Sequence, residues 1–220
     1  EEFRFYLFDK AQVNFTDEES RIMKTSSSGF QQCYNAQAAV DIEGSMLILG
    51  AYVTNETNDK EQFKPALASV DPSTRKITDA LADSGYFSGE AISDIESDPE
   101  TTIETYCAVG RVKHGRTVED LEKKEDEPYS DEGLTEKEKM QEKLKTKRGR
   151  ECYKLRKQTV EPVFGIIKEV LGFRQFSMRG IVKVNLEWDL ISIAYNLKRI
   201  FKVQDGRDLP SFDKSFYIGG

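Results

Sequence analysis

Two strand-like runs joined by a short turn constrain the fold most strongly. Phe30–Val40 is rich in small and aromatic residues, and Ser45–Thr54 is mostly apolar and β-branched. The four residues between them, Asp41–Gly44, have the composition of a turn. Two strand-like runs at this spacing predict a hairpin, and the second run has the composition of a buried strand.

Helical and strand-like segments alternate around this hairpin. Glu61–Val70 has the apolar spacing of a short helix, which Asp71-Pro72 ends. The other predicted elements are strands at Gln12–Phe15, Lys76–Ala82 and Thr101–Val109, and a helix at Glu90–Ile95 that Ser88 opens. The order β-β-β-α-β-α-β predicts an α/β fold in which a mixed sheet carries helices on its faces.

A charged segment interrupts this order at residues 111–150. It is dense in Lys and Glu and poor in apolar residues, so we interpret it as an insertion, looped to about residue 133. A helix is expected from Thr135, with Thr135 as N-cap and Glu138 in the reciprocal capping position. The predicted organisation is 1–110 as the first part of the core, 111–150 as the insertion, 151–202 as a helical part, and 203–220 as a loose tail.

The helical part contains two breaks and a long last helix. Pro162 predicts either a restart of the helix, with the proline in its first turn, or a kink, and Gly172 ends it. Ile181–Phe201 is expected to be one helix. Its predicted core residues are Val184, Trp188, Ile191, Ile193, Tyr195, Leu197 and Ile200.

Composition limits the classes of function. A chain of 220 residues fits one domain, or one domain with an inserted subdomain. No apolar run approaches a membrane span, and no signal peptide opens the sequence. The three cysteines are far apart and His114 is the single histidine, which excludes a disulfide framework or zinc knuckle and fits a reducing cytoplasm.

The net charge of −7 is unevenly distributed. Residues 1–110 carry 8 Lys and Arg against 20 Asp and Glu, whereas residues 151–202 carry 10 against 5. A basic C-terminal region can meet a polyanion although the whole chain is acidic.

The most distinctive stretch is Tyr153–Lys168. Lys157, Glu161, Phe164 and Lys168 recur at steps of four, three and four, so a continuous helix places them on one face. A carboxylate flanked by cations suits a face that meets a polyanion and a metal ion together. The alternative is an ordinary amphipathic helix whose charges are solvated.

Three carboxylates stand at positions that could converge. Asp17 follows the first predicted strand, Asp83 follows the strand before a glycine-containing turn, and Glu161 lies on the late helix. Carboxylates without Cys or His suit Mg²⁺, and two such ions can promote in-line phosphoryl displacement. Asp41, Asp59 and Asp79 compete for the first two positions, and each also suits a turn or a cap.

Several motifs in order resemble a bacterial insertion-sequence transposase of the DDE type. They are Thr16-Asp17 with Ser20–Thr25, Gly29-Phe30 with Tyr34–Asp41, Ala82–Ser88, Lys157–Gly165, Gly172–Arg174, Arg179-Gly180, Glu187-Trp188 and Tyr195–Leu197. The resemblance extends to about Phe201 and is greatest to the subgroup usually numbered 1182. It implies a ribonuclease-H-like fold with a charged insertion before the last catalytic helix.

The same resemblance implies site residues and partners. Asp17, Asp83 and Glu161 would form the catalytic triad that binds Mg²⁺, or Mn²⁺ in its place. Tyr153, Arg156 and Lys168 would grip phosphates of double-stranded DNA at the transposon ends. Four residues separate Arg156 from Glu161 where the wider signature has three, so either Arg156 or Lys157 fills the arginine's role. Arg174 and Arg179 are further predicted phosphate contacts.

Three functions follow from this reading. The first is a bacterial, cytoplasmic, nucleoid-associated enzyme that cuts DNA and transfers strands, with a homodimer forming the synaptic complex. The second is an inactive or repurposed remnant that binds DNA or a protein, which fits the expected lack of the family's helical region before Asp17. The third is a nuclease for branched DNA or hybrids. Phe164, Trp188 and Tyr195 are predicted to be core residues rather than base-stacking platforms.

Overall fold

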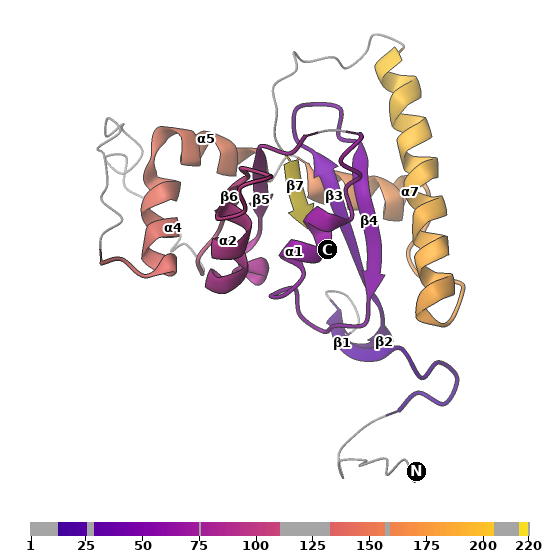
Figure 1. The fold of residues 1–220 in the computed structure, drawn as a ribbon. Coiled ribbons are helices and arrows are strands. Elements are labelled where there is room, and N and C mark those ends of the chain that lie inside the picture. The colour runs from indigo at the N-terminus through magenta and orange to yellow at the C-terminus, as the bar shows by residue number, and fades with distance from the viewer. Residues whose placement is uncertain are drawn as a thin grey trace.

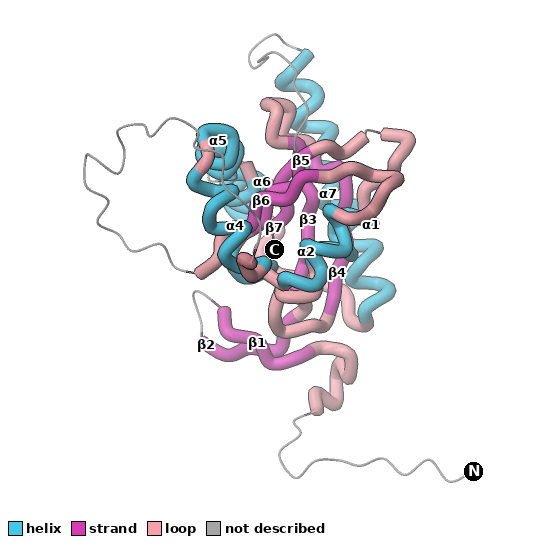
Figure 2. Tube along the Cα trace, turned by 60° about the vertical axis from the view of Figure 1, so that its left-hand side comes forward, coloured by secondary structure: helices cyan, strands magenta, loops and turns pink. Residues whose placement is uncertain are grey.

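The computed structural model describes residues 13–25, 29–74, 76–110, 133–156 and 159–204, and the backbone alone of residues 216–219. A five-stranded sheet in the order β4-β3-β7-β5-β6 forms its centre (Figure 1). The strands are β3 (Asn35–Asp41), β4 (Ile48–Thr54), β5 (Asp79–Ala82), β6 (Glu104–Cys107) and β7 (Phe216–Gly219). A separate hairpin, β1 (Arg21–Thr25) with β2 (Gly29–Cys33), projects beyond this sheet (Figure 2).

The sheet is mixed, as the sequence predicts. β3 pairs antiparallel with β4 across the turn after Asp41, and β5 pairs parallel with β6. β7 lies between these two pairs, antiparallel to β3 and parallel to β5. The last strand of the chain therefore joins the halves of the sheet.

Helices cover both faces because side chains alternate along each strand. Ala39, Ala80 and Ala82 face the core shared with α1 (Phe63–Ala68) and α2 (Gly89–Glu96). Ala38 and Leu81 face the opposite core, which α6 (Val160–Gly165) and α7 (Ile181–Gln204) cover. Small alanines on the first face let α1 and α2 approach closely.

Two helices near the predicted end of the insertion dock beside β6, and the second of them crosses the boundary predicted at residue 150. α4 (Glu136–Lys145) begins with the predicted capping box of Thr135 and Glu138. α5 (Lys147–Leu155) follows after Thr146, whose hydroxyl accepts from the Gly149 N–H and donates to the Lys143 carbonyl. A Cβ at Gly149 would lie 2.1 Å from the Lys143 carbonyl oxygen, so this tight corner requires glycine.

The chain then restarts as α6, with Pro162 in its first turn, and passes into the π-helical segment η3 (Ile166–Val170). This confirms the restart rather than the kink. Gly172 adopts a φ of 81°, a left-handed conformation that suits glycine at a helix end.

α7 protects the edge of the sheet in place of another strand. The Asn196 amide accepts from the Ile48 N–H at 2.8 Å and donates to the Ile48 carbonyl at 2.7 Å. The Asn185 amide makes the same pair of hydrogen bonds with Val53, at 2.7 and 3.2 Å. These contacts satisfy backbone groups of edge strand β4 and fix how α7 is rotated about its axis.

Four predictions about elements were wrong. Residues 13–16 form a loop and turn instead of a strand, and the run Phe30–Val40 is divided at Tyr34 into β2 and β3. The tail contributes β7, because its backbone fills the gap between β3 and β5. Ile193, Leu197 and Ile200 are exposed, because α7 turns a different face to the sheet. The expected loop at 111–132 lies outside the described residues.

No helix in the described ranges is both long and apolar enough to span a membrane.

Candidate functional site

Asp83 occupies the position that the sequence predicts, directly after β5. Its carboxylate accepts from the Ser84 N–H at 2.6 Å and so caps the short 3-10 helix η1 (Ser84–Tyr86). The buried Cys107 thiol donates to the Asp83 carbonyl at 3.1 Å. Burial raises the pKa of Cys107 to about 12, so this thiol remains protonated and acts as a structural donor. The Asp83 side chain itself stays half-exposed at 52%.

Arg156 is the cation at this carboxylate. Its Nη1 lies 2.6 Å from Asp83 Oδ1, and its side chain is only 16% exposed. The guanidinium also lies 5.1 Å from the centre of the Tyr153 ring, within the range of a cation–π contact. The structure therefore brings together three residues that the sequence singled out in two distant motifs.

Two ion pairs align α5 with β5. Arg148 Nη2 lies 2.8 Å from Asp79 Oδ1 at the start of β5, and Arg156 meets Asp83 just after its end. Arg148 and Arg156 are eight residues apart, which is about 12 Å along a helix. Asp79 and Asp83 are four residues apart, which is about 13 Å along a strand, so the two cations and the two carboxylates have matching spacings. Arg148 thereby helps to set where Arg156 lies.

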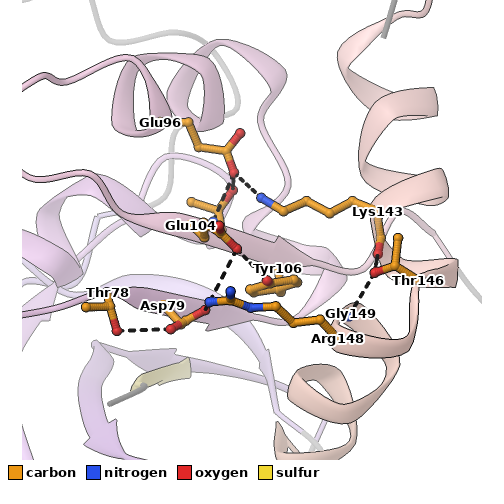
Figure 3. A network of polar contacts seen from close by, with 10 residues as sticks. Thr78, Asp79, Glu96, Glu104, Tyr106, Lys143, Thr146, Arg148 and Gly149 are labelled. Atoms are coloured by element: carbon orange, nitrogen blue, oxygen red, sulfur yellow. Dashed lines mark hydrogen bonds and ion pairs between the residues drawn. The ribbon is translucent and has the colours of Figure 1, made fainter. Parts of the chain in front are cut away.

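A polar network supports this alignment from the neighbouring strand (Figure 3). Glu104 lies 3.6 Å from Arg148 and accepts from the Tyr106 hydroxyl at 2.6 Å. Glu96 receives Lys143 of α4 at 2.6 Å and the Thr105 hydroxyl at 2.6 Å. Burial raises the pKa of Glu96, but these hydrogen bonds and the Lys143 charge outweigh it, and the net shift is downward.

A second polar network lies beside the Asp83 turn. Asp59 Oδ1 accepts from the side-chain amides of Asn35, at 2.7 Å, and Gln37, at 2.8 Å. The Tyr86 hydroxyl donates to Gln37 Oε1, which links this network to η1. A Cβ at Gly85 would lie 3.6 Å from Asp59 Oδ2. The sequence analysis did not predict this network. The signal that could have indicated it is Gln37, a polar residue in the otherwise apolar, buried part of β3.

The other competing aspartates lie at the opposite end of the sheet. Asp41 ends β3, where it accepts from the Glu43 N–H and from the Ser45 hydroxyl. Asp79 begins β5 and pairs with Arg148. These contacts give Asp41 a structural role in the turn after β3, and they give Asp79 a structural role in holding α5 against β5.

Asp17 lies in a turn rather than at the end of a strand. Its Oδ1 accepts from the Tyr34 hydroxyl at 2.6 Å and from the Gly180 N–H at 3.3 Å. Burial and the Asp17 hydrogen bond raise the pKa of Tyr34 to about 12, so Tyr34 stays a donor.

The sheet register separates Asp17 from Asp83. Ala82 and Ala39 both pair with Ile218, which places Asp83 level with Ala38. Tyr34, the partner of Asp17, precedes Ala38 by four residues, or roughly 13 Å of extended chain.

Glu161 is exposed in the first turn of α6. Phe164, one turn later, stacks on Trp188 with ring centres 5.6 Å apart, and Trp188 donates to the Gln37 carbonyl at 2.9 Å. α6 therefore approaches the end of the sheet that carries Asp83. Phe164, Trp188 and Tyr195 pack in or against the core, as predicted.

The remaining predicted DNA contacts are distributed over the C-terminal segments. Lys168 Nζ lies 5.4 Å from the centre of the Phe164 ring. Arg174 is exposed and lies 2.5 Å from Glu169, and Arg179 is exposed. Lys157 lies outside the described residues.

The carboxylates fit a hard cation in chemistry and only partly in position. Asp83 is half-exposed and already neighbours the positive charge of Arg156. Within the described parts of the chain, however, no three Asp, Glu, His or Cys side chains gather closely enough to hold a metal ion. The structure thus shows one suitable carboxylate and does not assemble the predicted triad, whose assignment remains a prediction.

Comparison with protein families matches a part of the chain. Residues 120–201 match the family model of the transposase DDE domain. This match supports a DDE transposase. The matched range contains Glu161, Tyr153, Arg156 and Lys168, whereas Asp17 and Asp83 precede it. Neither the curated proteins nor the solved structures gave a match.

Proposed function

We propose that this chain is the catalytic domain of a DDE transposase, with a ribonuclease-H-like core, that cuts and joins double-stranded DNA at the ends of an insertion sequence. The observation that carries the proposal is the Arg156–Asp83 pair. It joins the segment that matches the transposase family to the carboxylate after β5 that the motif order singled out. The likeness to the subgroup numbered 1182 is part of the proposal.

The proposed roles follow from charge and exposure. Lys168, Arg174 and Arg179 would bind backbone phosphates without reading bases, and Tyr153 would support Arg156 through its ring. Asp17, Asp83 and Glu161 are the residues that would hold Mg²⁺ or Mn²⁺. Such ions, when bound, supply charge stabilisation and an activated oxygen for phosphoryl transfer.

The deciding experiment compares DNA cleavage and joining by the wild type, Asp83→Asn and Glu161→Gln. Asp71→Asn and Glu151→Gln are matched controls, because they make the same chemical changes at exposed positions. We expect activity with Mg²⁺ or Mn²⁺ in the wild type and in both controls, and a loss of at least about 100-fold in both site variants.

A DNA- or protein-binding remnant is the second candidate, and the absence of a three-ligand cluster among the described residues favours it. It predicts that the wild type binds duplex DNA but neither cleaves it nor binds Mn²⁺. DNA cleavage that survives both site substitutions would contradict the proposed catalytic residues.

A further inference from the structure

The outer face of α7 carries a continuous apolar stripe. Its side chains are large and between 39% and 74% exposed. They are Val182, Leu186, Leu190, Ile193, Leu197, Ile200 and Phe201. Exposed apolar patches of this size mark interaction surfaces more often than single exposed side chains do.

The helix cannot bury this stripe by rotating. Its opposite face, with Trp188 and Tyr195, is already buried in the core. The hydrogen bonds of Asn185 and Asn196 with β4 fix the helix about its axis. α7 is therefore apolar on two sides. The sheet covers one of them, and Figure 1 shows α7 lying along the sheet beside β4.

We propose that the α7 stripe is the surface through which two copies of this chain pair, with their α7 helices antiparallel. From Leu186 the stripe residues follow at steps of four, three, four and three, the spacing of a left-handed coiled-coil seam. In the reverse direction, from Ile200 to Leu186, the stripe residues again follow at steps of three and four. An antiparallel second copy therefore presents a stripe with the same spacing. A twofold axis near Ile193 would thus bring Leu190 against Leu197 of a second copy.

The area of the stripe is sufficient for such a pair. A fully exposed aliphatic side chain offers on the order of 100 Å² of apolar surface, and a phenylalanine offers more. At the observed exposures the seven side chains present roughly 500 Å² per copy, or about 1,000 Å² over two copies, the lower limit of a stable interface.

The helix dipoles favour the antiparallel orientation, because the two dipoles oppose one another in it, whereas in a parallel pair they repel.

Sedimentation over a concentration series tests the pairing, with Leu190→Glu as the disruptive variant and Val170→Glu as its control. Leu190 is 63% and Val170 60% exposed, so neither change should affect folding, which thermal unfolding verifies. We expect a dimer for wild type and control, and a rise of roughly 100-fold or more in the dimer dissociation constant for Leu190→Glu.

Disulfide crosslinking tests the orientation. Differently tagged copies carrying Leu190→Cys and Leu197→Cys should crosslink to each other, whereas Leu190→Cys alone should not, and the wild type controls for its native cysteines. A Leu190→Cys self-crosslink would overturn the antiparallel order. A wild type that stays monomeric at roughly 100 µM would overturn the pairing and indicate another occupant. Pairing should persist in Asp83→Asn, so this result is independent of the proposed catalysis.

Discussion

Arg156 forms an ion pair with Asp83, whose carboxylate would bind a metal ion under the proposed function. Its Nη1 lies 2.6 Å from Asp83 Oδ1, so the guanidinium and a divalent cation compete for the same oxygen. We predict that Arg156→Ala binds Mn²⁺ about two- to five-fold more tightly than the wild type, because the pair is partly exposed and worth little in water. Isothermal titration with Mn²⁺ measures this, and DNA affinity should fall in the same variant.

Lys154→Ala is the control for that experiment. It removes a positive charge from the exposed side of the same helix, two residues before Arg156. Equal Mn²⁺ affinity in the wild type, the control and Arg156→Ala would show that Asp83 does not take part in binding the metal.

At the scale of elements, the position of α5 depends on the buried carboxylate of Asp79. Arg148 and Thr78 are its partners, and the loss of the arginine leaves a charge without compensation. We predict that Arg148→Ala lowers the free energy of unfolding by about 1–2 kcal/mol, because Arg148 itself is largely exposed. Urea unfolding measures the change, with Lys154→Ala as control; equal stability of the two variants would refute the alignment role.

The attachment of α4 to β6 should depend on pH. The folded-state pKa of Glu96 lies below its ordinary value of 4.5, so the ionised group stabilises the fold above that pH. This stability should be lost as the pH falls through the lowered pKa. We predict that Glu96→Gln is less stable than wild type near neutral pH and that the difference shrinks below about pH 4. Glu187, whose pKa is also lowered, should keep its own acid dependence in that variant.

At the scale of the whole molecule, local patterns in the sequence predicted most elements and few of the long-range contacts. The capping box at Thr135 and the turn after Asp41 depend on neighbouring residues, so sequence alone placed them correctly. The exposed face of α7 did not follow from periodicity, because the helix is apolar on both sides. Which side is buried depends on Asn185 and Asn196 meeting a strand more than 130 residues earlier.

The candidate site shows the same limit. The turn after β5 placed Asp83 correctly, whereas the expected strand before Asp17 is absent and Asp17 bonds with Tyr34 instead. The pairing of Arg156 with Asp83 and of Arg148 with Asp79 depends on how α5 lies along β5. That alignment is a property of the folded chain, and no spacing in the sequence encodes it directly.

β7 connects the two halves of the central sheet, β4-β3 and β5-β6. Its backbone pairs with β3 on one side and β5 on the other, so its N–H groups belong to a central ladder. Proline at such a position removes a donor and fixes φ, and the carbonyl left without its hydrogen bond costs about 1–3 kcal/mol. We predict that Tyr217→Pro lowers the unfolding free energy by about that amount. Tyr217→Thr, which keeps the N–H and favours a strand, should lose much less. Hydrogen exchange at β3 and β5 should rise together in the proline variant. If the two substitutions were equally mild, β7 would not be the strand that joins the two halves.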